Sequence, residues 1–255
     1  MKVIELYKYL DSAIPPALSC DWDNDGLMCC SDPDREVKKV LVALDITERV
    51  VKYAIDGGFD VILSHHPMIF KKLGSIDPSL GTARKAIELI KNGISAMSFH
   101  TRLDALQGGV NDTLCKKLGV RNAVPFGPEG ETIGRIGMLD APMTPEEISA
   151  RIKNELGAPI VLVSDCGKAA HKVAVLGGDG KDFVSAAIKA GADTYISGRI
   201  SYNMMAEAPE MGINLIEAGH FFTENPICEM LARLTKTFTP TAETEIFCSN
   251  EIKFL

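Results

Sequence analysis

Short apolar runs, separated by stretches with helical periodicity, recur along the chain and predict an α/β fold. The runs are four to six residues long, as buried strands are, and lie at residues 39–44, 60–63, 94–98, 173–176 and 214–218. Because helical stretches lie between them, we expect the strands to run parallel, with right-handed crossovers. Other local signals agree with this pattern, since Thr144 is a natural N-cap and Pro145 suits the first position of a helix.

Part of this pattern occurs twice along the chain. The corresponding pairs are each 133 positions apart, namely Lys39 and Lys172, Gly58 and Gly191, and Ser64 and Ser197. Each copy then adds a helix and a strand that opens with Gly-Ile, at positions 93 and 212. The repeat predicts two similar, duplicated α/β halves with mixed, largely parallel sheets. The pattern breaks near Pro125-Phe126-Gly127-Pro128, so we expect the halves to be residues 1–126 and 127–255.

Four of the five histidines follow predicted strands, and two of them precede a carboxylate at a fixed spacing. They are His65 with His66, His100 with Asp104, and His220 with Glu224. Open α/β sheets place their sites at the carboxyl ends of strands. Imidazole and carboxylate together are the ligand set of borderline divalent metals. A single histidine at a strand end is more often a surface residue, but two His-x3-carboxylate spacings rarely arise by chance, so the pattern predicts a metal site.

The two copies differ at the histidine pair. Where the first copy has His65 and His66, the second has Gly198 and Arg199. The ligands are therefore unevenly shared between the copies. We expect one metal site in a cleft between the two halves rather than two independent sites.

Composition and charge exclude several classes of protein. The net charge is −7, and no Lys/Arg-rich stretch carries interleaved aromatic residues, which argues against a nucleic-acid surface. The chain contains no apolar run of about 18 residues, so the sequence predicts no membrane span. The seven cysteines form no CxxC pair, which predicts reduced thiols in a cytoplasmic protein. For Cys29 and Cys30, packing in a core or loop is favoured over contact with a ligand.

Longer motifs surround the candidate ligands. They are Trp22-Asp23-Asn24-Asp25-Gly26-Leu27, Ser64-His65-His66-Pro67, His100-Thr101-Arg102-Leu103-Asp104 leading into Gly108-Gly109-Val110-Asn111-Asp112, and Gly219-His220-Phe221-Phe222-Thr223-Glu224. Together, and nearly end to end, they resemble the Nif-three-like dinuclear metal family, also called GTP cyclohydrolase 1 type 2. The chain resembles the short form of that family, which lacks an inserted domain.

The resemblance implies two divalent metal ions per chain, zinc, iron or manganese. The ligands it implies are His65, His66, Asp104, His220 and Glu224, with Asp104 able to bridge both ions. His100 would lie beside the ions, either as a catalytic residue that moves a proton or as a group that orients Asp104. The family also implies a homohexamer. One departure is that relatives commonly carry an acidic residue at Arg199 and a histidine at Asn203, so the polar roles of those positions do not carry over.

Five side chains do not saturate two divalent ions, and open coordination positions are typical of catalytic or ligand-binding sites. The two ions and two carboxylates sum to a charge of about +2, which attracts phosphate or another anion. We therefore expect a metal-dependent hydrolase that acts on a nucleotide or phosphorylated heterocycle through metal-activated water, as the family name suggests. The alternative is a non-enzymatic metal-binding or adaptor protein. The chain has no P-loop and no base-reading motif, which leaves the substrate open.

Two further motifs each have two interpretations. Trp22 beside polar residues suits a ring that stacks on a base or pterin-like ligand, and it equally suits a half-buried core residue. Gly108 and Gly109, ahead of a helix predicted at residues 110–118, would let a phosphate approach backbone N–H groups. A tight turn is the favoured interpretation of this glycine pair, because no longer glycine signature accompanies it.

Overall fold

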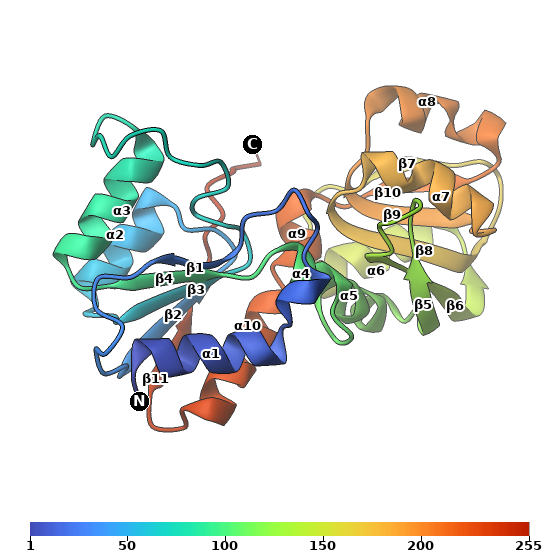
Figure 1. Ribbon diagram of the computed structural model, residues 1–255. Coiled ribbons are helices and arrows are strands. Elements are labelled where there is room, and N and C mark those ends of the chain that lie inside the picture. The colour runs from blue at the N-terminus through green and yellow to red at the C-terminus, as the bar shows by residue number, and fades with distance from the viewer. Residues whose placement is uncertain (255) are drawn as a thin grey trace. The chain divides into compact units, whose positions relative to one another are not determined.

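The computed structural model describes residues 1–254 and is an α/β fold with two mixed sheets (Figure 1). The described residues form two compact units. The first unit comprises Met1–Leu103 and Ile227–Ile252, and the second comprises Asp104–Pro226 with residues 253–254. The first unit is therefore built from two separate stretches of the sequence.

The first unit contains a five-stranded sheet, counted over residues 1–254, in the order β1-β4-β3-β2-β11. Strands β2, β3, β4 and β11 are parallel, and β1 pairs antiparallel with β4 at the edge. Its elements are α1 (Val3–Ala13), η1 (Pro16–Leu18), β1 (Gly26–Cys29), β2 (Lys39–Ala43), α2 (Glu48–Asp56), β3 (Val61–Ser64), α3 (Gly81–Lys91), β4 (Ser95–Ser98), α10 (Ile227–Phe238) and β11 (Glu243–Ile246). The short helix α4 (Thr101–Ala105) spans the point at which the first unit ends and the second begins.

Helices cover both faces of the first sheet, with α2 and α3 on one face and α1 and α10 on the other (Figure 1). Leu41 and Ile62 point to the α2–α3 face and pack with Val50 and Leu89. Because both faces are covered, the inner strands β2 and β3 are almost wholly buried and mainly apolar, which is why they appear in the sequence as continuous runs. Cys29 is buried in the same core, as its packing interpretation predicts.

The second unit contains a six-stranded sheet, counted over the same described residues, in the order β5-β6-β8-β9-β10-β7. Strands β8, β9 and β10 are parallel, and β5, β6 and β7 run antiparallel to their neighbours. Its elements are α5 (Val110–Leu118), β5 (Arg121–Phe126), β6 (Gly134–Met143), α6 (Pro145–Leu156), β7 (Leu162–Ser164), β8 (Ala170–Asp179), η2 (Lys181–Phe183), α7 (Val184–Lys189), β9 (Thr194–Arg199), α8 (Tyr202–Met211), β10 (Asn214–Glu217) and α9 (His220–Glu224).

Alternate residues of β8 face different layers of the second unit. Val173 and Val175 pack with residues of α5 and α6, whereas Ala174 and Leu176 pack with residues of α7 and α8. Successive side chains of a strand point to opposite faces, so this alternation follows from strand geometry. The second unit is therefore also a sheet between two helical layers.

The helix boundaries agree closely with the sequence signals. Helix α5 begins at Val110 and ends at Leu118, as predicted. At the start of α6, Thr144 Oγ1 accepts a hydrogen bond from the Glu147 N–H, and the Glu147 carboxylate accepts one from the Thr144 N–H. This reciprocal capping box satisfies two backbone donors that the helix itself leaves unpaired. Within residues 1–254, none of the helices has the length and hydropathy that a bilayer-spanning segment needs.

The central strands of the two units pair in the same register. In the first unit Val40 pairs with Val61 across the parallel strands β2 and β3. In the second, Val173 pairs with Thr194 across β8 and β9. Both members of the pair are thus shifted by 133 positions, the offset found in the sequence.

Asp60, before β3, and Asp193, before β9, make the same contacts in their two units. The Asp60 carboxylate accepts hydrogen bonds from the N–H groups of residues 38 and 39, at 2.8 and 3.0 Å. The Asp193 carboxylate accepts from the N–H groups of residues 171 and 172, at 3.0 and 2.7 Å. These aspartates are themselves 133 positions apart, so the repeated sequence produces repeated hydrogen bonds.

The division into units differs from the halves expected at residue 126. Residue 126 ends β5, which pairs antiparallel with β6 in the second sheet. The Pro- and Gly-rich segment at residues 125–128 therefore marks the connection between two paired strands rather than a boundary between units. The chain enters the second unit at Asp104 and leaves it after Pro226.

Candidate metal centre

Three histidines lie together at the carboxyl ends of the parallel strands in the first unit. His65 and His66 directly follow β3, and His100 follows β4, which is its neighbour in the sheet. The ring centroids are 5.0 Å apart for His65 and His66, 5.2 Å for His65 and His100, and 5.6 Å for His66 and His100. Each ring offers a nitrogen within 4.8 Å of a nitrogen of the others, so these three side chains could hold a metal ion.

The Nδ1 atom of each of these histidines is next to a hydrogen-bond acceptor. His65 Nδ1 is 3.0 Å from the Phe99 carbonyl oxygen, and His66 Nδ1 is 2.6 Å from a carboxylate oxygen of Asp45. His100 Nδ1 is 2.9 Å from a carboxylate oxygen of Asp23. Since these oxygens only accept, Nδ1 carries the proton in each ring. In the neutral rings the lone pair is therefore on Nε2.

This arrangement is the one that metal-ligating histidines adopt, because an acceptor on one ring nitrogen fixes the tautomer and orientation of the other. His65 is buried and the other two rings are partly buried. Three ring nitrogens within 4.8 Å of one another, in rings partly removed from water, form a set of donors that would be costly if more than one ring were protonated. A divalent cation offsets that cost, so the donor set fits a metal.

A buried ionic network holds the segment that carries His100. The Asp23 carboxylate accepts from the His100 ring and from the N–H and Oγ1 of Thr101, at 3.0 and 2.6 Å. Burial raises the pKa of Asp23, but these hydrogen bonds outweigh it and keep the pKa well below its usual range. Asp25 accepts from the His100 N–H and from Arg102 Nε. The position of His100 is therefore fixed by the two aspartates of Trp22-Asp23-Asn24-Asp25.

The second unit carries three candidate ligands of its own. His220 and Glu224 are one turn apart in α9, and His220 Nε2 is 2.8 Å from a Glu224 carboxylate oxygen. A carboxylate oxygen of Asp104 is within 4.8 Å of one of Glu224. Both carboxylates are buried. Two buried carboxylates this close repel each other and lose hydration, which a cation offsets.

Asn111 positions the backbone around Asp104. Its buried side chain donates to the Asp104 carbonyl oxygen at 3.3 Å and to that of Ile133 at 3.0 Å. Its Oδ1 accepts from the N–H of Gly177 in β8, at 2.8 Å. One side chain therefore ties the start of the second unit to the strand against which α9 packs.

Glycines at the end of β8 allow α9 to approach the strand closely. A Cβ atom on Gly177 would lie 3.1 Å from Glu224 Cγ, and a Cβ atom on Gly178 would lie 2.1 Å from Glu224 Oε1. Gly178 also has a φ of 70°, which favours glycine, and its N–H donates to Thr223 Oγ1 at 3.1 Å. The absence of side chains at these two positions makes room for the Glu224 carboxylate.

The chain as a whole matches a known protein family. The sequence profile of the family described as Duf34/NIF3 (NGG1p interacting factor 3) matches residues 1–253. The chain belongs to this family.

Individual relatives agree with the family match over the whole chain. A GTP cyclohydrolase 1 type 2 homolog from Clostridium perfringens is 36% identical over 99% of this chain and 98% of its own length. A protein with the same name from Clostridium acetobutylicum is 34% identical over 91% of this chain and 89% of its own. The crystal structure of a Bacillus cereus protein related to NIF3 covers 100% of this chain and 99% of its own, with a TM-score of 0.89 at 22% identity. This last likeness supports the fold.

Each unit of this Duf34/NIF3 chain brings together part of the predicted site. The first unit gathers the predicted ligands His65 and His66 with His100, which the resemblance places beside the metals. In the structure, His100 has a ring nitrogen as close to its neighbours as a third ligand would need. The second unit gathers the predicted ligands Asp104, His220 and Glu224.

Sequence reasoning did not identify Asp23 and Asp45 as the partners that hold the rings of His100 and His66. A signal was present for Asp45, because it lies just beyond the strand β2, where polar residues of α/β sites are expected. Asp23 belongs to a motif quoted for the family resemblance, but nothing in its spacing indicates that its partner is 77 residues away.

The Gly108-Gly109 segment is a turn, as the favoured interpretation predicts. Gly108 has a φ of 79°, and its N–H donates to an Asp112 carboxylate oxygen at 2.6 Å. Asp112 also accepts from Arg135 Nε at 2.7 Å. The backbone donor that a phosphate would need is therefore already used by a carboxylate.

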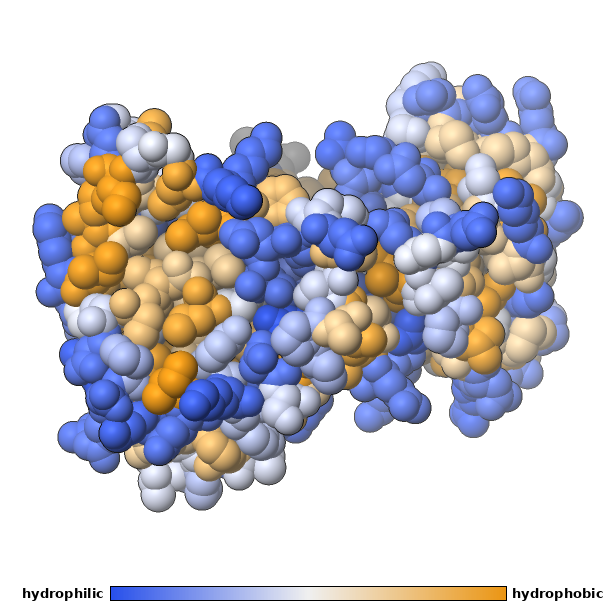
Figure 2. Space-filling model, in the orientation of Figure 1, coloured by the Kyte–Doolittle hydropathy of each residue, from blue (hydrophilic) through white to orange (hydrophobic). Residues whose placement is uncertain are grey.

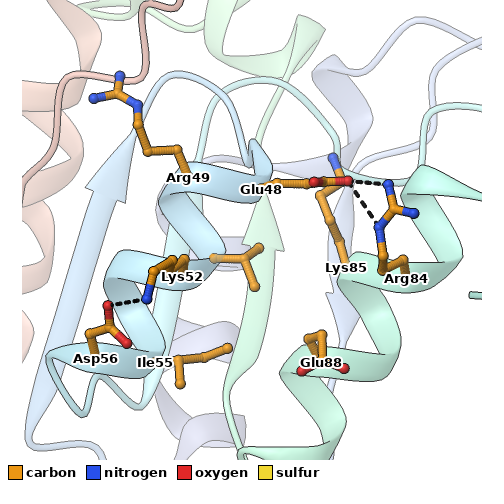
Figure 3. A pocket seen from close by; sticks show the side chains of 9 residues that line it. Glu48, Arg49, Lys52, Ile55, Asp56, Arg84, Lys85 and Glu88 are labelled. Atoms are coloured by element: carbon orange, nitrogen blue, oxygen red, sulfur yellow. Dashed lines mark hydrogen bonds and ion pairs between the residues drawn. The ribbon is translucent and has the colours of Figure 1, made fainter.

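A pocket of about 540 Å³ lies elsewhere in the first unit, between α2 and α3 (Figure 3). Its lining contains none of the predicted site residues. Charged side chains on its rim pair with each other, Glu48 with Arg84 and Lys52 with Asp56. Such a groove with internally paired charges is typical of a solvated helix–helix surface.

We expect Gly178→Ala to disturb the Glu224 carboxylate and thereby to lower metal affinity. The matched control is Gly157→Ala, since Gly157 has nearly the same φ, 71°, but an added Cβ would meet no heavy atom within 4 Å. Both variants should lose about 1–2 kcal/mol of stability, because a Cβ is unfavourable at positive φ. Only Gly178→Ala should bind zinc more weakly in calorimetric titration. Equal zinc binding by the two variants would show that the contact with Glu224 does not matter.

Proposed function

We propose that this protein is a metal-dependent hydrolase that acts on a nucleotide or a phosphorylated heterocycle. We propose that His65, His66, Asp104, His220 and Glu224 hold two divalent ions, zinc, iron or manganese, in one dinuclear site. The observation that carries the proposal is the set of hydrogen bonds that places the proton of all three clustered imidazoles on Nδ1. Metal-ligating histidines almost always donate their other ring N–H in this way, and a general-base histidine held by a carboxylate does the same.

The remaining donors support the same proposal. Asp104 and Glu224 are buried carboxylates with close oxygen atoms, and His220 contacts Glu224. Imidazole nitrogen suits zinc and iron better than calcium or magnesium, and the carboxylate oxygens also suit manganese. When bound, such ions supply Lewis acidity and lower the pKa of coordinated water, on which hydrolysis near neutral pH relies.

His100 is the residue that we propose to handle a proton. The His100 Nδ1–H donates a hydrogen bond to Asp23, so the neutral ring can accept a proton at Nε2. The Asp23 carboxylate would then stabilise the imidazolium through the same hydrogen bond, as a carboxylate does for a general-base histidine. The alternative role for His100 is that of a third imidazole ligand beside His65 and His66. His100→Ala distinguishes the two, because loss of a proton carrier leaves metal content unchanged and loss of a ligand does not.

The nature of the substrate is proposed from the relatives and from charge. The relatives from two Clostridium species are named GTP cyclohydrolase 1 type 2 homologs, which supports a nucleotide-related role. Two divalent ions with two carboxylates give a site of about +2, which favours a small anionic or nucleotide-like ligand. Opening of the guanine ring of GTP and hydrolysis of a phosphoester are both compatible with such a site.

An adaptor that binds metal or a protein partner is the second candidate. The observation in its favour is the family description, NGG1p interacting factor 3, which names a protein interaction. An adaptor of this kind would bind metal through the same residues but would catalyse no reaction. It is the better explanation if no substrate is found.

We further propose that the protein is a homo-oligomer, with a hexamer as the expected form. Hydrophobic residues gather on the first unit over α3 and β1, where Ile90 is 51% exposed (Figure 2). Strand β1 also lies at the edge of its sheet. Both features suit a surface that another copy covers. Light scattering should give a mass several times the chain mass of 27.6 kDa, and a monomer would contradict the proposal.

Two other proposals concern origin and location. The shared register and the shared aspartate contacts at an offset of 133 positions support a duplication that produced two similar halves. All seven cysteines are thiols, which supports a reducing compartment such as the cytoplasm.

The test of the hydrolase is a screen of metal-loaded protein against nucleotides and phosphoesters. Ring opening of GTP is followed by the change in ultraviolet absorbance, and phosphoester hydrolysis by released phosphate. A true activity should disappear in His65→Ala and in chelator-treated protein, and return when metal is added back to the wild type. Turnover that survives in His65→Ala would come from a contaminant or from another site, and no turnover across the panel would favour the adaptor.

A further inference from the structure

Two large aromatic side chains next to the histidine cluster are exposed to solvent. Trp22 is 57% exposed and Phe70 is 46% exposed. Their ring centroids are 6.2 Å apart, at an angle of 75°. Each is also edge-on to the His100 ring, with centroids 6.3 Å away for Trp22 and 6.0 Å for Phe70. Trp22 is thus not the half-buried core residue that one interpretation of the sequence allows.

Polar contacts hold both aromatic residues in place. Asn24, two residues after Trp22, donates from Nδ2 to the carbonyl oxygen of Ile69, the residue before Phe70. Asp23, directly after Trp22, is bonded to the His100 ring and to Thr101. The rings are therefore exposed on segments that are tied to each other and to the site. Apolar rings held rigidly in water beside polar functional groups are typical of a ligand platform.

Two exposed lysines on the Phe70 side of the ring pair would attract an anionic ligand. Lys71 and Lys72 directly follow Phe70, and both are exposed. Asp21, directly before Trp22, is exposed as well, and Asp23, directly after it, is bonded to the His100 ring and Thr101, so two carboxylates beside Trp22 balance the two lysines beside Phe70. A flat ring that carries phosphate would contact the aromatic faces and be attracted by the lysines.

We propose that Trp22 and Phe70 form a stacking subsite for a planar heteroaromatic ring, such as a nucleobase, that bears phosphate. This inference rests on the proposed function, and it assigns the recognition of the heterocycle to two residues outside the set of metal ligands. A protein partner is the less suitable occupant, because a stable interface needs roughly 800 Å² from each side. Two half-exposed aromatic side chains offer only about 200 Å².

The chain itself provides a reporter for this subsite, because Trp22 is the only tryptophan among its 255 residues. We expect GTP, GMP and guanosine to change its fluorescence emission saturably, after correction for absorbance. Ribose 5-phosphate and tripolyphosphate, which have no ring to stack, should leave the emission unchanged. The titrations are made with both metal-free and zinc-loaded protein, so that binding of phosphate to metal is separated from stacking.

Variants then measure the contribution of each ring by calorimetry with GMP. Trp22→Ala and Phe70→Ala should each weaken binding about tenfold, the usual loss when a base-stacking aromatic side chain is truncated. Trp22→Phe should restore binding to within about threefold of wild type, because it keeps a π-face. Ile76→Ala is the matched control, since Ile76 is 75% exposed and only six residues from Phe70. It should bind GMP as the wild type does.

The outcomes separate this inference from the proposed hydrolase. Ring-dependent emission changes without turnover would uphold the subsite and reject the hydrolase. Turnover of a nucleotide with an unchanged KM in Trp22→Ala would uphold the hydrolase and overturn the subsite. Emission that varies with protein concentration but not with any ring-bearing ligand would also overturn it, and would assign the rings to contact with a second copy.

Discussion

Asp104→Ala and Glu224→Ala are expected to lower the metal content from about two ions per chain to less than one. Both carboxylates are buried and have oxygens within 4.8 Å of each other, so each is proposed to contact an ion that the other also stabilises. Removing either one leaves a single carboxylate to balance the charge of two divalent cations. Elemental analysis of protein purified with excess metal measures the loss directly.

Asp140→Ala is a suitable control for these variants. Asp140 is also a carboxylate of the second unit, but it is exposed and paired with Arg121 at 2.7 Å. It should retain the metal content of the wild type. Full metal content in Asp104→Ala and Glu224→Ala would refute the dinuclear site. A wild-type protein that holds less than one ion per chain would refute it as well.

Arg102→Met should destabilise the protein by about 3–5 kcal/mol, the usual cost of removing one partner from a buried ionic network. Arg102 is 1% exposed and donates to Asp25, Asp11 and the carbonyl oxygen of Ile14. Methionine fills much of the volume but leaves the Asp25 carboxylate buried without its cation. Urea unfolding of chelator-treated protein measures the effect without a contribution from bound metal.

The matched comparison for Arg102→Met is Arg49→Met. Arg49 is also in the first unit and forms an ion pair with Glu251 at 2.8 Å, but both side chains are about half exposed. Exposed pairs contribute at most about 1 kcal/mol. Similar losses in the two variants would mean that the buried network around Arg102 contributes no more than a surface ion pair.

The sequence was sufficient for those features that depend on local chemistry. The parallel strands β2 and β3 were predicted because both their faces are buried, and α6 because Thr144 and Glu147 cap it within one turn, whereas the polar strand β11 was not predicted. The histidines were found because they directly follow strands. In contrast, the partners Asp23 and Asp45 bond to histidines 77 and 21 residues away, and no periodicity encodes such contacts.

The division into units could not be predicted for a similar reason. The repeat with an offset of 133 positions was visible, and the strand registers follow it. However, a Pro- and Gly-rich segment such as residues 125–128 is typical both of a linker between two units and of a connection between two strands of one sheet. The pairing of β5 with β6 decides between them, and that pairing is a tertiary contact.

The interrupted first unit has a consequence for synthesis on the ribosome. Strand β11 pairs with β2, and α10 packs on both strands, yet these elements are made only after the whole second unit. A nascent chain that has reached Pro226 can complete the second sheet, while β2 still has an uncovered edge. The second unit is therefore able to fold first, and residues 227–252 then complete the first unit. A stop codon ahead of α10 would leave that edge open to pairing with other chains.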